Sequence, residues 1–229
     1  MSEIQLVIFD CDGVLMDSEI VAAAAELEIY KEFGIEMEPA EFAIRFAGKD
    51  SALILADMET ELGHELPDET LKKIIANVDA KCGLEAKMID DADVALDLLD
   101  QARCICSNGP QIKMRHMLDR VGLYDKFRPY IFSAKDLDPP AHKPKPDIFH
   151  KALEEFSVKP AEALVIEDSI HGISGARTAG TRVVGFTGAS HTFPGHADQL
   201  IEAGAETVIS RLSDLPGIVE AFSMWDGMK

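Results

Sequence analysis

The sequence predicts an α/β protein whose core is a doubly wound parallel sheet carrying a helical insert. A short apolar run over residues 4–9 is typical of a buried strand that opens the sheet. Helical patterns then fill residues 16–89, with no strand expected among them. From residue 92 onward, short apolar strands alternate with helices, which predicts right-handed crossovers and a parallel sheet.

The insert shows apolar residues at helical spacing. Asp50 or Ser51 is suited to cap its third helix, and Gly34 and Gly63 are placed to end two of the helices. The helices are expected over residues 20–34, 39–46, 51–63 and 68–83. The chain is therefore divided into a core, residues 1–15 and 90–229, and an inserted helical domain, residues 16–89.

The second half of the core is predicted element by element from its alternating pattern. Strands are expected over residues 103–106, 130–133, 163–166, 182–186 and 207–209, and helices over residues 92–101, 112–121, 146–156 and 172–179. In such a sheet, the ligand binds beyond the carboxyl ends of the strands.

Composition excludes several classes of partner. The net charge of −19 and the pI near 4.6 argue against nucleic acid or an anionic membrane, so an anionic substrate needs a local basic pocket. The first residues lack a basic region, and no apolar run approaches the roughly 18 residues of a membrane span. The cysteines form no C-x-x-C pair and are expected to be reduced thiols of a cytoplasmic protein: Cys11, Cys82, Cys104 and Cys106.

The segment that follows the first strand carries two carboxylates. Asp10 and Asp12 are two positions apart, so an extended chain points both side chains in one direction. Like charges aimed at one point repel unless a cation lies between them, and oxygen ligands favour Mg²⁺. Gly13 allows a tight turn beside that ion.

Polar residues also follow the later strands. Ser107 and Asn108 follow the second strand, Lys143 lies in the loop after the third, and Glu167 and Asp168 follow the fourth. A doubly wound sheet would bring all of these groups to one edge.

In order along the chain, these motifs resemble the four signature motifs of the haloacid dehalogenase-like phosphohydrolases. They read D-x-D-G-x-x-x-D over residues 10–17, S-N at 107–108, K-P-x-P-D-x-F over 143–149 and E-D-S-x-x-G over 167–172. The resemblance implies a Rossmann-like core. The position of the insert resembles the helical cap of the β-phosphoglucomutase-like branch.

The resemblance implies a role for each motif. Asp10 would be the nucleophile and form an aspartyl-phosphate, and Asp12 would act as general acid and then as base. Ser107 and the Asn108 backbone N–H would hold phosphoryl oxygens, and Lys143 would supply compensating positive charge. Mg²⁺ would be held by Asp10, the Asp12 carbonyl and Asp168, with Glu167 as a ligand or as a partner of the ligands.

The insert would select the substrate. Arg45, Gly48 and Lys49 resemble the specificity loop of the family, and Glu19 is placed to face the substrate; a solvated surface turn is the alternative for the loop. The run 107–110 followed by Lys113 is similar to bacterial phosphatases of the sugar-acid phosphate type, such as 6-phosphogluconate phosphatase.

Simpler interpretations exist for single residues. Ser107 and Asn108 also suit a helix cap, and an isolated Lys143 would be read as a solvated loop lysine. Asp17 is expected to cap a helix or brace a loop. His171 is expected to be a loop residue, because Mg²⁺ prefers oxygen ligands.

The sequence thus predicts a Mg²⁺-dependent phosphatase that acts on a small phosphorylated metabolite, with a sugar or sugar-acid phosphate as the expected substrate. A phosphoglucomutase is the alternative, since it uses the same residues and differs in how well it excludes water. A non-catalytic metabolite-binding protein is the second alternative, and it would be expected to have lost at least one of the charged residues Asp10, Asp12, Lys143 and Asp168; all are present.

Overall fold

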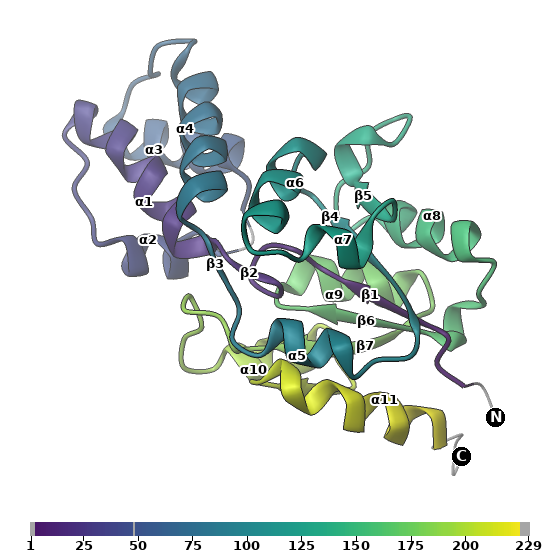
Figure 1. The fold of residues 1–229 in the computed structure, drawn as a ribbon. Coiled ribbons are helices and arrows are strands. Elements are labelled where there is room, and N and C mark those ends of the chain that lie inside the picture. Colours follow the sequence, from purple (N-terminus) through teal and green to yellow (C-terminus); the bar gives the residue numbers. More distant parts are fainter. Residues whose placement is uncertain (1–2, 48, 225–229) are drawn as a thin grey trace.

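The computed structural model describes residues 3–47 and 49–224 and contains a sheet of six parallel strands (Figure 1). The strand order is β5-β4-β1-β6-β7-β8, so the chain winds outward from β1 in both directions, which confirms the doubly wound α/β prediction. The strands are β1 Leu6–Phe9, β4 Ala102–Ser107, β5 Ile131–Ser133, β6 Ala163–Glu167, β7 Arg182–Phe186 and β8 Thr207–Ile209.

Helices cover both faces of the sheet. Alternate residues of each strand point to opposite faces, so Val7 and Phe9 join one apolar cluster while Leu6 and Ile8 join another. The first cluster is closed by α5 Ala92–Asp97, α6 Gln111–Arg120, α7 Tyr124–Phe127 and α11 Leu215–Met224. The second is closed by α8 Asp147–Phe156, α9 Ile170–Thr178 and α10 His196–Glu202.

Four helices between β2 and β3 stand to one side of the sheet and have an apolar cluster of their own (Figure 1). Tyr30, Met58 and Ile74 are fully buried in it. The Asp50 carboxylate accepts hydrogen bonds from the first backbone N–H groups of α3, which is the cap expected from the sequence. The helices are α1 Glu19–Tyr30, α2 Pro39–Arg45, α3 Ser51–Leu62 and α4 Thr70–Glu85.

Two short strands join this helical block to the sheet. β2 (Met16–Asp17) pairs antiparallel with β3 (Lys87–Met88), and the Ile89 N–H donates to the Leu15 carbonyl at 3.0 Å. The expectation of no strand within residues 16–89 was therefore wrong. Two-residue strands are too short to show a period of two, and these form only because distant segments meet.

Several further elements were missed by the sequence pattern. Helices α7 and α10 are too short for a helical period to be recognised, and Pro216 and Gly217 at the start of α11 are typical of a loop. Pro216 is tolerated there because the first turn of a helix does not use its N–H groups. Single turns of 3₁₀-helix occupy Lys31–Phe33, Ala134–Asp136, Pro160–Glu162 and Leu212–Asp214.

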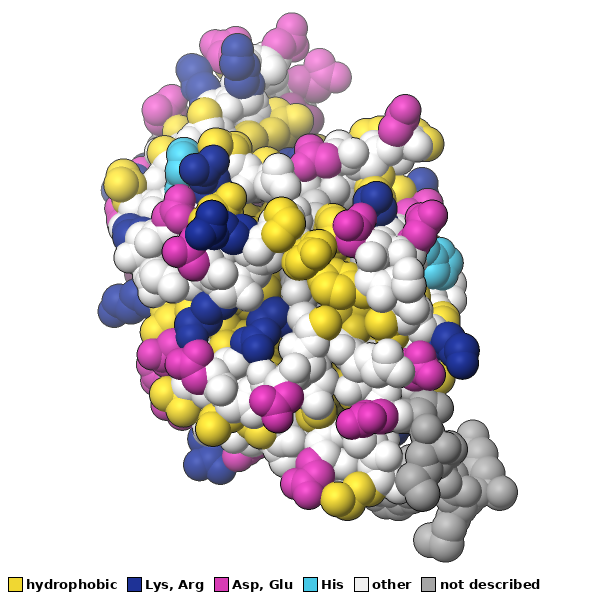
Figure 2. Space-filling model, turned by 45° about the vertical axis from the view of Figure 1, so that its right-hand side comes forward, with side chains coloured by type: hydrophobic (Ala, Val, Ile, Leu, Met, Phe, Trp, Pro, Cys, Tyr) yellow, Lys and Arg dark blue, Asp and Glu magenta, His cyan; other side chains and the backbone are white. Residues whose placement is uncertain are grey.

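The surface agrees with the charge composition. Figure 2 shows acidic and basic side chains interspersed over one face of the molecule rather than a basic stripe. Within the described residues, every helix is either too short or too polar to cross a membrane.

Candidate active site

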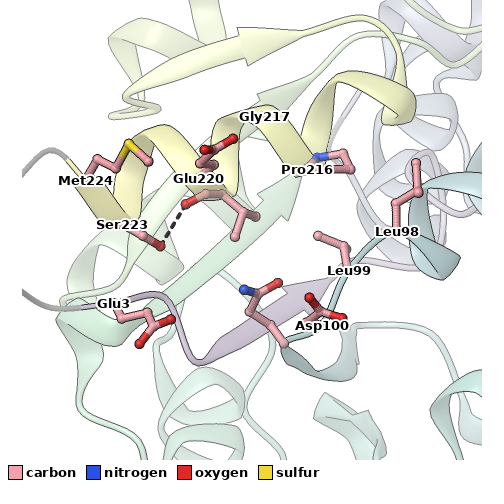
Figure 3. A pocket seen from close by; sticks show the side chains of 11 residues that line it. Glu3, Leu98, Leu99, Asp100, Pro216, Gly217, Glu220, Ser223 and Met224 are labelled. Atoms are coloured by element: carbon pink, nitrogen blue, oxygen red, sulfur yellow. Dashed lines mark hydrogen bonds between the residues drawn. The ribbon is translucent and has the colours of Figure 1, made fainter.

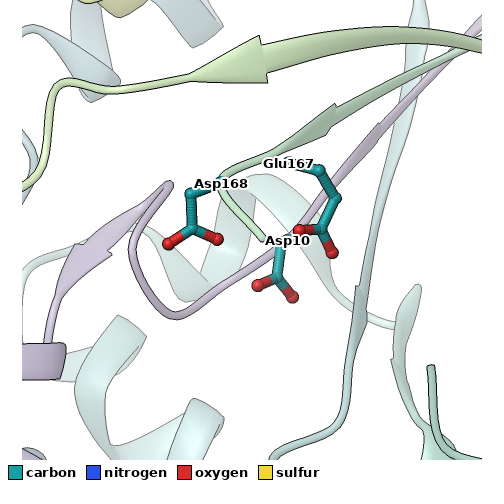
Figure 4. A group of neighbouring side chains, drawn as sticks. All are labelled: Asp10, Glu167 and Asp168. Atoms are coloured by element: carbon teal, nitrogen blue, oxygen red, sulfur yellow. The ribbon is translucent and has the colours of Figure 1, made fainter. Parts of the chain in front are cut away.

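Three carboxylates converge at the carboxyl ends of β1 and β6. These strands pair directly, with Phe9 opposite Ile166, so the residues that follow them leave the sheet at one point. Asp10, Glu167 and Asp168 each offer an oxygen atom, and these atoms lie within 4.8 Å of one another. Figure 4 shows the side chains of the three residues close together at the ends of these strands.

Lys143 lies against this carboxylate cluster and is almost inaccessible to solvent. Its Nζ is 2.8 Å from Asp10 Oδ1 and 2.5 Å from Glu167 Oε1. Burial lowers the pKa of Lys143, but the two carboxylates outweigh this and raise it above its usual value, so the ammonium stays charged. The Lys143 N–H donates to Asn108 Oδ1 at 2.9 Å, which ties its loop to the end of β4.

The donor chemistry of the carboxylate cluster fits a hard divalent cation. The pKa of Asp10 lies well above its usual value. Burial and the neighbouring Glu167 and Asp168 carboxylates raise it, and together they outweigh the lowering by Lys143. The Lys143 ammonium contacts Asp10 and Glu167, and an added cation that prefers oxygen ligands would relieve the excess negative charge of the cluster. Glu167 already accepts hydrogen bonds at both oxygens, from Lys143 and from the Ser169 N–H and hydroxyl, which leaves Asp10 and Asp168 as the more available donors.

Asp12 is held by two donors of different kinds. The Ser18 hydroxyl donates to its Oδ1 at 2.6 Å, and Lys113 Nζ lies 3.0 Å from both of its carboxylate oxygens. Although burial raises the pKa of Asp12, Lys113 and Ser18 bring it below its usual value. Lys113 was not predicted as a site residue, although the motif at 107–110 followed by this lysine drew attention to the segment.

Ser107 and Asn108 lie where β4 ends. The Gly109 N–H donates to Ser107 Oγ at 3.0 Å, and the Ser133 hydroxyl donates to the Gly109 carbonyl at 2.8 Å. The loop after β4 is therefore fastened to β5 on one side and, through Asn108, to Lys143 on the other.

Two histidines that were not predicted from the sequence lie beyond β7, His191 in the loop and His196 at the start of α10. His191 Nε2 is 3.1 Å from Asp168 Oδ2, and His196 Nε2 is 2.8 Å from the Asp168 carbonyl oxygen. The Ser190 hydroxyl donates to Asp17 Oδ1 at 2.7 Å, so Asp17 braces this loop. Because β7 neighbours β6, the polar residues after β7 were the available signal. His171 is exposed on α9.

The predicted substrate residues lie in different surroundings. Glu19 lies near the site, where burial and the Asp12 and Asp168 carboxylates raise its pKa to about 7. Arg45 forms an ion pair with Glu61, and Lys49 forms one with Asp57, so both cations are paired with helix α3. Gly48 lies outside the described residues.

A cavity of about 680 Å³ lies at the opposite edge of the sheet (Figure 3). It is bordered by Glu3, by the segment that precedes β4 and by α11. Glu3 precedes β1 and residues 98–101 precede β4, so the cavity borders the amino ends of these strands and shares no lining residue with the carboxylate cluster.

Residues 4–180 match the model of the haloacid dehalogenase-like hydrolase family. The chain belongs to this family. The resemblance inferred from the four motifs is thereby confirmed, as is the prediction of a hydrolase.

This haloacid dehalogenase-like hydrolase is 30% identical over 227 residues to 6-phosphogluconate phosphatase of Escherichia coli strain K12, with 99% of each chain covered. Its structure is similar to that of a haloacid dehalogenase-like protein of unknown function from Agrobacterium tumefaciens, with 48% identity, a TM-score of 0.89 and coverage of 96% and 99% of the two chains. A hydrolase of the family from Deinococcus radiodurans, solved with bound phosphate and sodium, is 25% identical with a TM-score of 0.81 and covers 99% of this chain and 100% of its own.

Proposed function

We propose that this hydrolase is a Mg²⁺-dependent phosphatase that cleaves a small sugar phosphate or sugar-acid phosphate through an aspartyl-phosphate on Asp10. The observation that carries the proposal is the contact of the buried Lys143 ammonium with Asp10 inside a cluster of three carboxylates. A carboxylate nucleophile beside a fixed cation is what attack on an anionic phosphate requires.

The residues support two displacements at phosphorus. In the first, Asp10 attacks the phosphorus atom, the ester P–O bond breaks, and Asp12 gives a proton to the leaving oxygen. In the second, Asp12 takes a proton from water, the water oxygen attacks phosphorus, and the Asp10 carboxylate is released. Lys143 would hold the phosphoryl oxygens with Ser107 and the Asn108 N–H.

The proposed metal site consists of Asp10, Asp168 and the Asp12 carbonyl, with Glu167 acting mainly through Lys143 and Ser169. When bound there, Mg²⁺ would offset the repulsion between the Asp10 carboxylate and the phosphate. Two supporting observations are the geometry of the carboxylate cluster and the hard oxygen donors it supplies.

We further propose that residues 16–89 form a cap over a core of residues 1–15 and 90–229. The apolar cluster formed by α1–α4 and the short strand pair β2–β3 at the junction with the core support this division. Closure of such a cap would expel water from the site. Arg45, Gly48, Lys49 and Glu19 remain the proposed substrate-facing residues of the cap.

The substrate class follows from the relatives and from charge. The relative that covers 99% of the chain is a 6-phosphogluconate phosphatase, and in a chain of net charge −19 Lys113 and Lys143 provide local positive charge at the site. We therefore place 6-phosphogluconate and related sugar phosphates first among the candidates.

Phosphate release from a panel of sugar and sugar-acid phosphates, measured with added Mg²⁺, tests this proposal. We expect turnover of at least one member and none by Asp10→Asn. Parallel incubation with glucose 1-phosphate and glucose 6-phosphate measures isomerised product. Isomerisation without phosphate release would favour the mutase instead, and absence of both activities over the panel would contradict the proposal.

A further inference from the structure

Lys113 has an unusual position for a lysine. It lies in the first turn of α6, where the backbone N–H groups and the helix dipole present positive charge and favour acidic side chains. Its side chain is only 10% exposed, so most of the solvation of the ammonium is lost. The contact with Asp12 compensates for both costs, since Lys113 Nζ reaches both carboxylate oxygens at 3.0 Å.

Gly109 makes room for this contact. A Cβ atom at position 109 would stand 3.2 Å from Asp12 Oδ2, 3.3 Å from Ser107 Oγ and 3.4 Å from Lys113 Cε. The glycine of the loop after β4 therefore borders the side of Asp12 that carries Oδ2. A side chain there would crowd both members of the Lys113–Asp12 pair.

The two carboxylate oxygens of Asp12 accept different numbers of hydrogen bonds. A carboxylate offers about four acceptor positions, two on each oxygen. Oδ1 accepts from both Ser18 and Lys113, whereas Oδ2 accepts only from Lys113 among the described contacts. One acceptor position thus remains, and it is on Oδ2.

From this asymmetry, and resting on the proposed function, we propose that Lys113 is a positioning residue that fixes the orientation of the Asp12 carboxylate and leaves Oδ2 as the oxygen through which the proton for the leaving group passes. In the first displacement, the Asp12 Oδ2–H bond breaks and the proton passes to the ester oxygen as the P–O bond breaks. The carboxylate that forms is held by Lys113 and Ser18. This arrangement serves alkyl phosphates such as sugar phosphates, whose leaving alkoxide needs the proton, whereas a nitrophenolate leaves without it.

A series of phosphate monoesters with different leaving groups tests this assignment. The steady-state constants are measured for p-nitrophenyl phosphate, phenyl phosphate and the best sugar phosphate, in wild type and in Lys113→Met. General acid catalysis supplies 10²–10⁴-fold, so we expect kcat/KM for the sugar phosphate to fall by about 10²-fold or more. For p-nitrophenyl phosphate we expect a change below about threefold, with phenyl phosphate between the two.

Further variants isolate the contact. Lys135→Met removes an exposed lysine from the turn after β5 and should leave kcat/KM unchanged for every ester. Lys113→Met added to Asp12→Asn should cause no further loss, since the two residues act as one unit. Ser18→Ala should show the same dependence on the leaving group, with a smaller loss of kcat/KM. If circular dichroism shows that Lys113→Met does not fold, Ser18→Ala takes its place as the test.

The outcomes separate this inference from the proposed function. An equal loss on all esters, a rise in KM alone, or wild-type rates in Lys113→Met and Ser18→Ala would overturn the positioning role and leave the phosphatase intact. A rise in KM confined to sugar-acid phosphates would make Lys113 a substrate-binding residue instead. Absence of phosphate release by the wild type from every ester, including p-nitrophenyl phosphate, would overturn the proposed function itself.

Discussion

Lys143 Nζ lies 2.8 Å from Asp10 Oδ1, although the two residues are 133 positions apart in the chain. The loop that carries Lys143 is joined to the end of β4 through Asn108, and Asp10 follows the neighbouring strand β1. The contact is therefore a product of the sheet topology, and it links the proposed nucleophile to the cation that would stabilise its reaction.

Replacing Lys143 by Met should abolish turnover and destabilise the fold. The change leaves Asp10 and Glu167 buried without their cation, and breaking a buried ion pair from one side costs about 3–5 kcal/mol. Urea unfolding measures the loss, and Lys145→Met, which removes an exposed lysine two residues away, serves as the matched control. Equal stability of the two variants would contradict the buried pair.

Chelation should remove activity reversibly, and Asp168→Asn should weaken the proposed metal site. We expect Mg²⁺ to raise the melting temperature of the wild type and the variant to need at least about tenfold more Mg²⁺ for the same rise. The variant without metal should be no less stable than the wild type, because one repelling carboxylate is gone. Asp198→Asn, on the exposed side of α10, should respond to Mg²⁺ as the wild type does. An unchanged Mg²⁺ response in Asp168→Asn would place the metal elsewhere.

Glu26 should make stability depend on pH. Burial raises its pKa to about 7 from 4.5, and within the described residues its Oε2 has no hydrogen-bond partner. The unfolded chain then releases a proton that the folded chain keeps, so the free energy of unfolding should fall as pH rises from 4.5 to 7 and level off above. The decrease that Glu26 contributes should be about 3 kcal/mol.

Glu26→Gln should make this dependence less steep and leave the part that comes from Glu19, since the amide does not titrate and can still accept the hydrogen bond from the Ser51 hydroxyl. Glu28→Gln, on an exposed position of the same helix, is the control and should keep the wild-type slope. Urea midpoints at pH 5 and pH 8 provide the comparison. Parallel slopes in wild type and Glu26→Gln would rule out Glu26 as the source.

Gly13→Ala should cost more than Gly63→Ala. Both glycines have a left-handed backbone, with φ of +75° and +74°, so alanine has a similar conformational cost of roughly 1–2 kcal/mol at each. At position 13 the new Cβ would lie 1.9 Å from Asp168 Oδ2, whereas at position 63 it meets nothing within 4 Å. We expect Gly63→Ala to retain full activity and Gly13→Ala to lose both stability and turnover, as measured by urea unfolding and phosphate release.

The sequence alone identified the family and most elements of the sheet. Buried strands appear as short apolar runs, and polar motifs at their ends survive as local patterns, so these patterns alone assign Asp10, Lys143 and Glu167 to one edge. The same local patterns could not reveal β2 and β3, which are too short to show a period.

Only the tertiary structure decided which side chains touch at that edge. The pairing of Lys113 with Asp12 depends on how α6 packs against the sheet, and that of His191 with Asp168 depends on the path of the loop after β7. Periodicity reports which face of an element is buried but carries no information about distances between elements. Contacts between residues that are remote in the chain are set by the packing of whole elements. Which side chains pair within the site therefore depends on the tertiary structure and could not be predicted from local patterns.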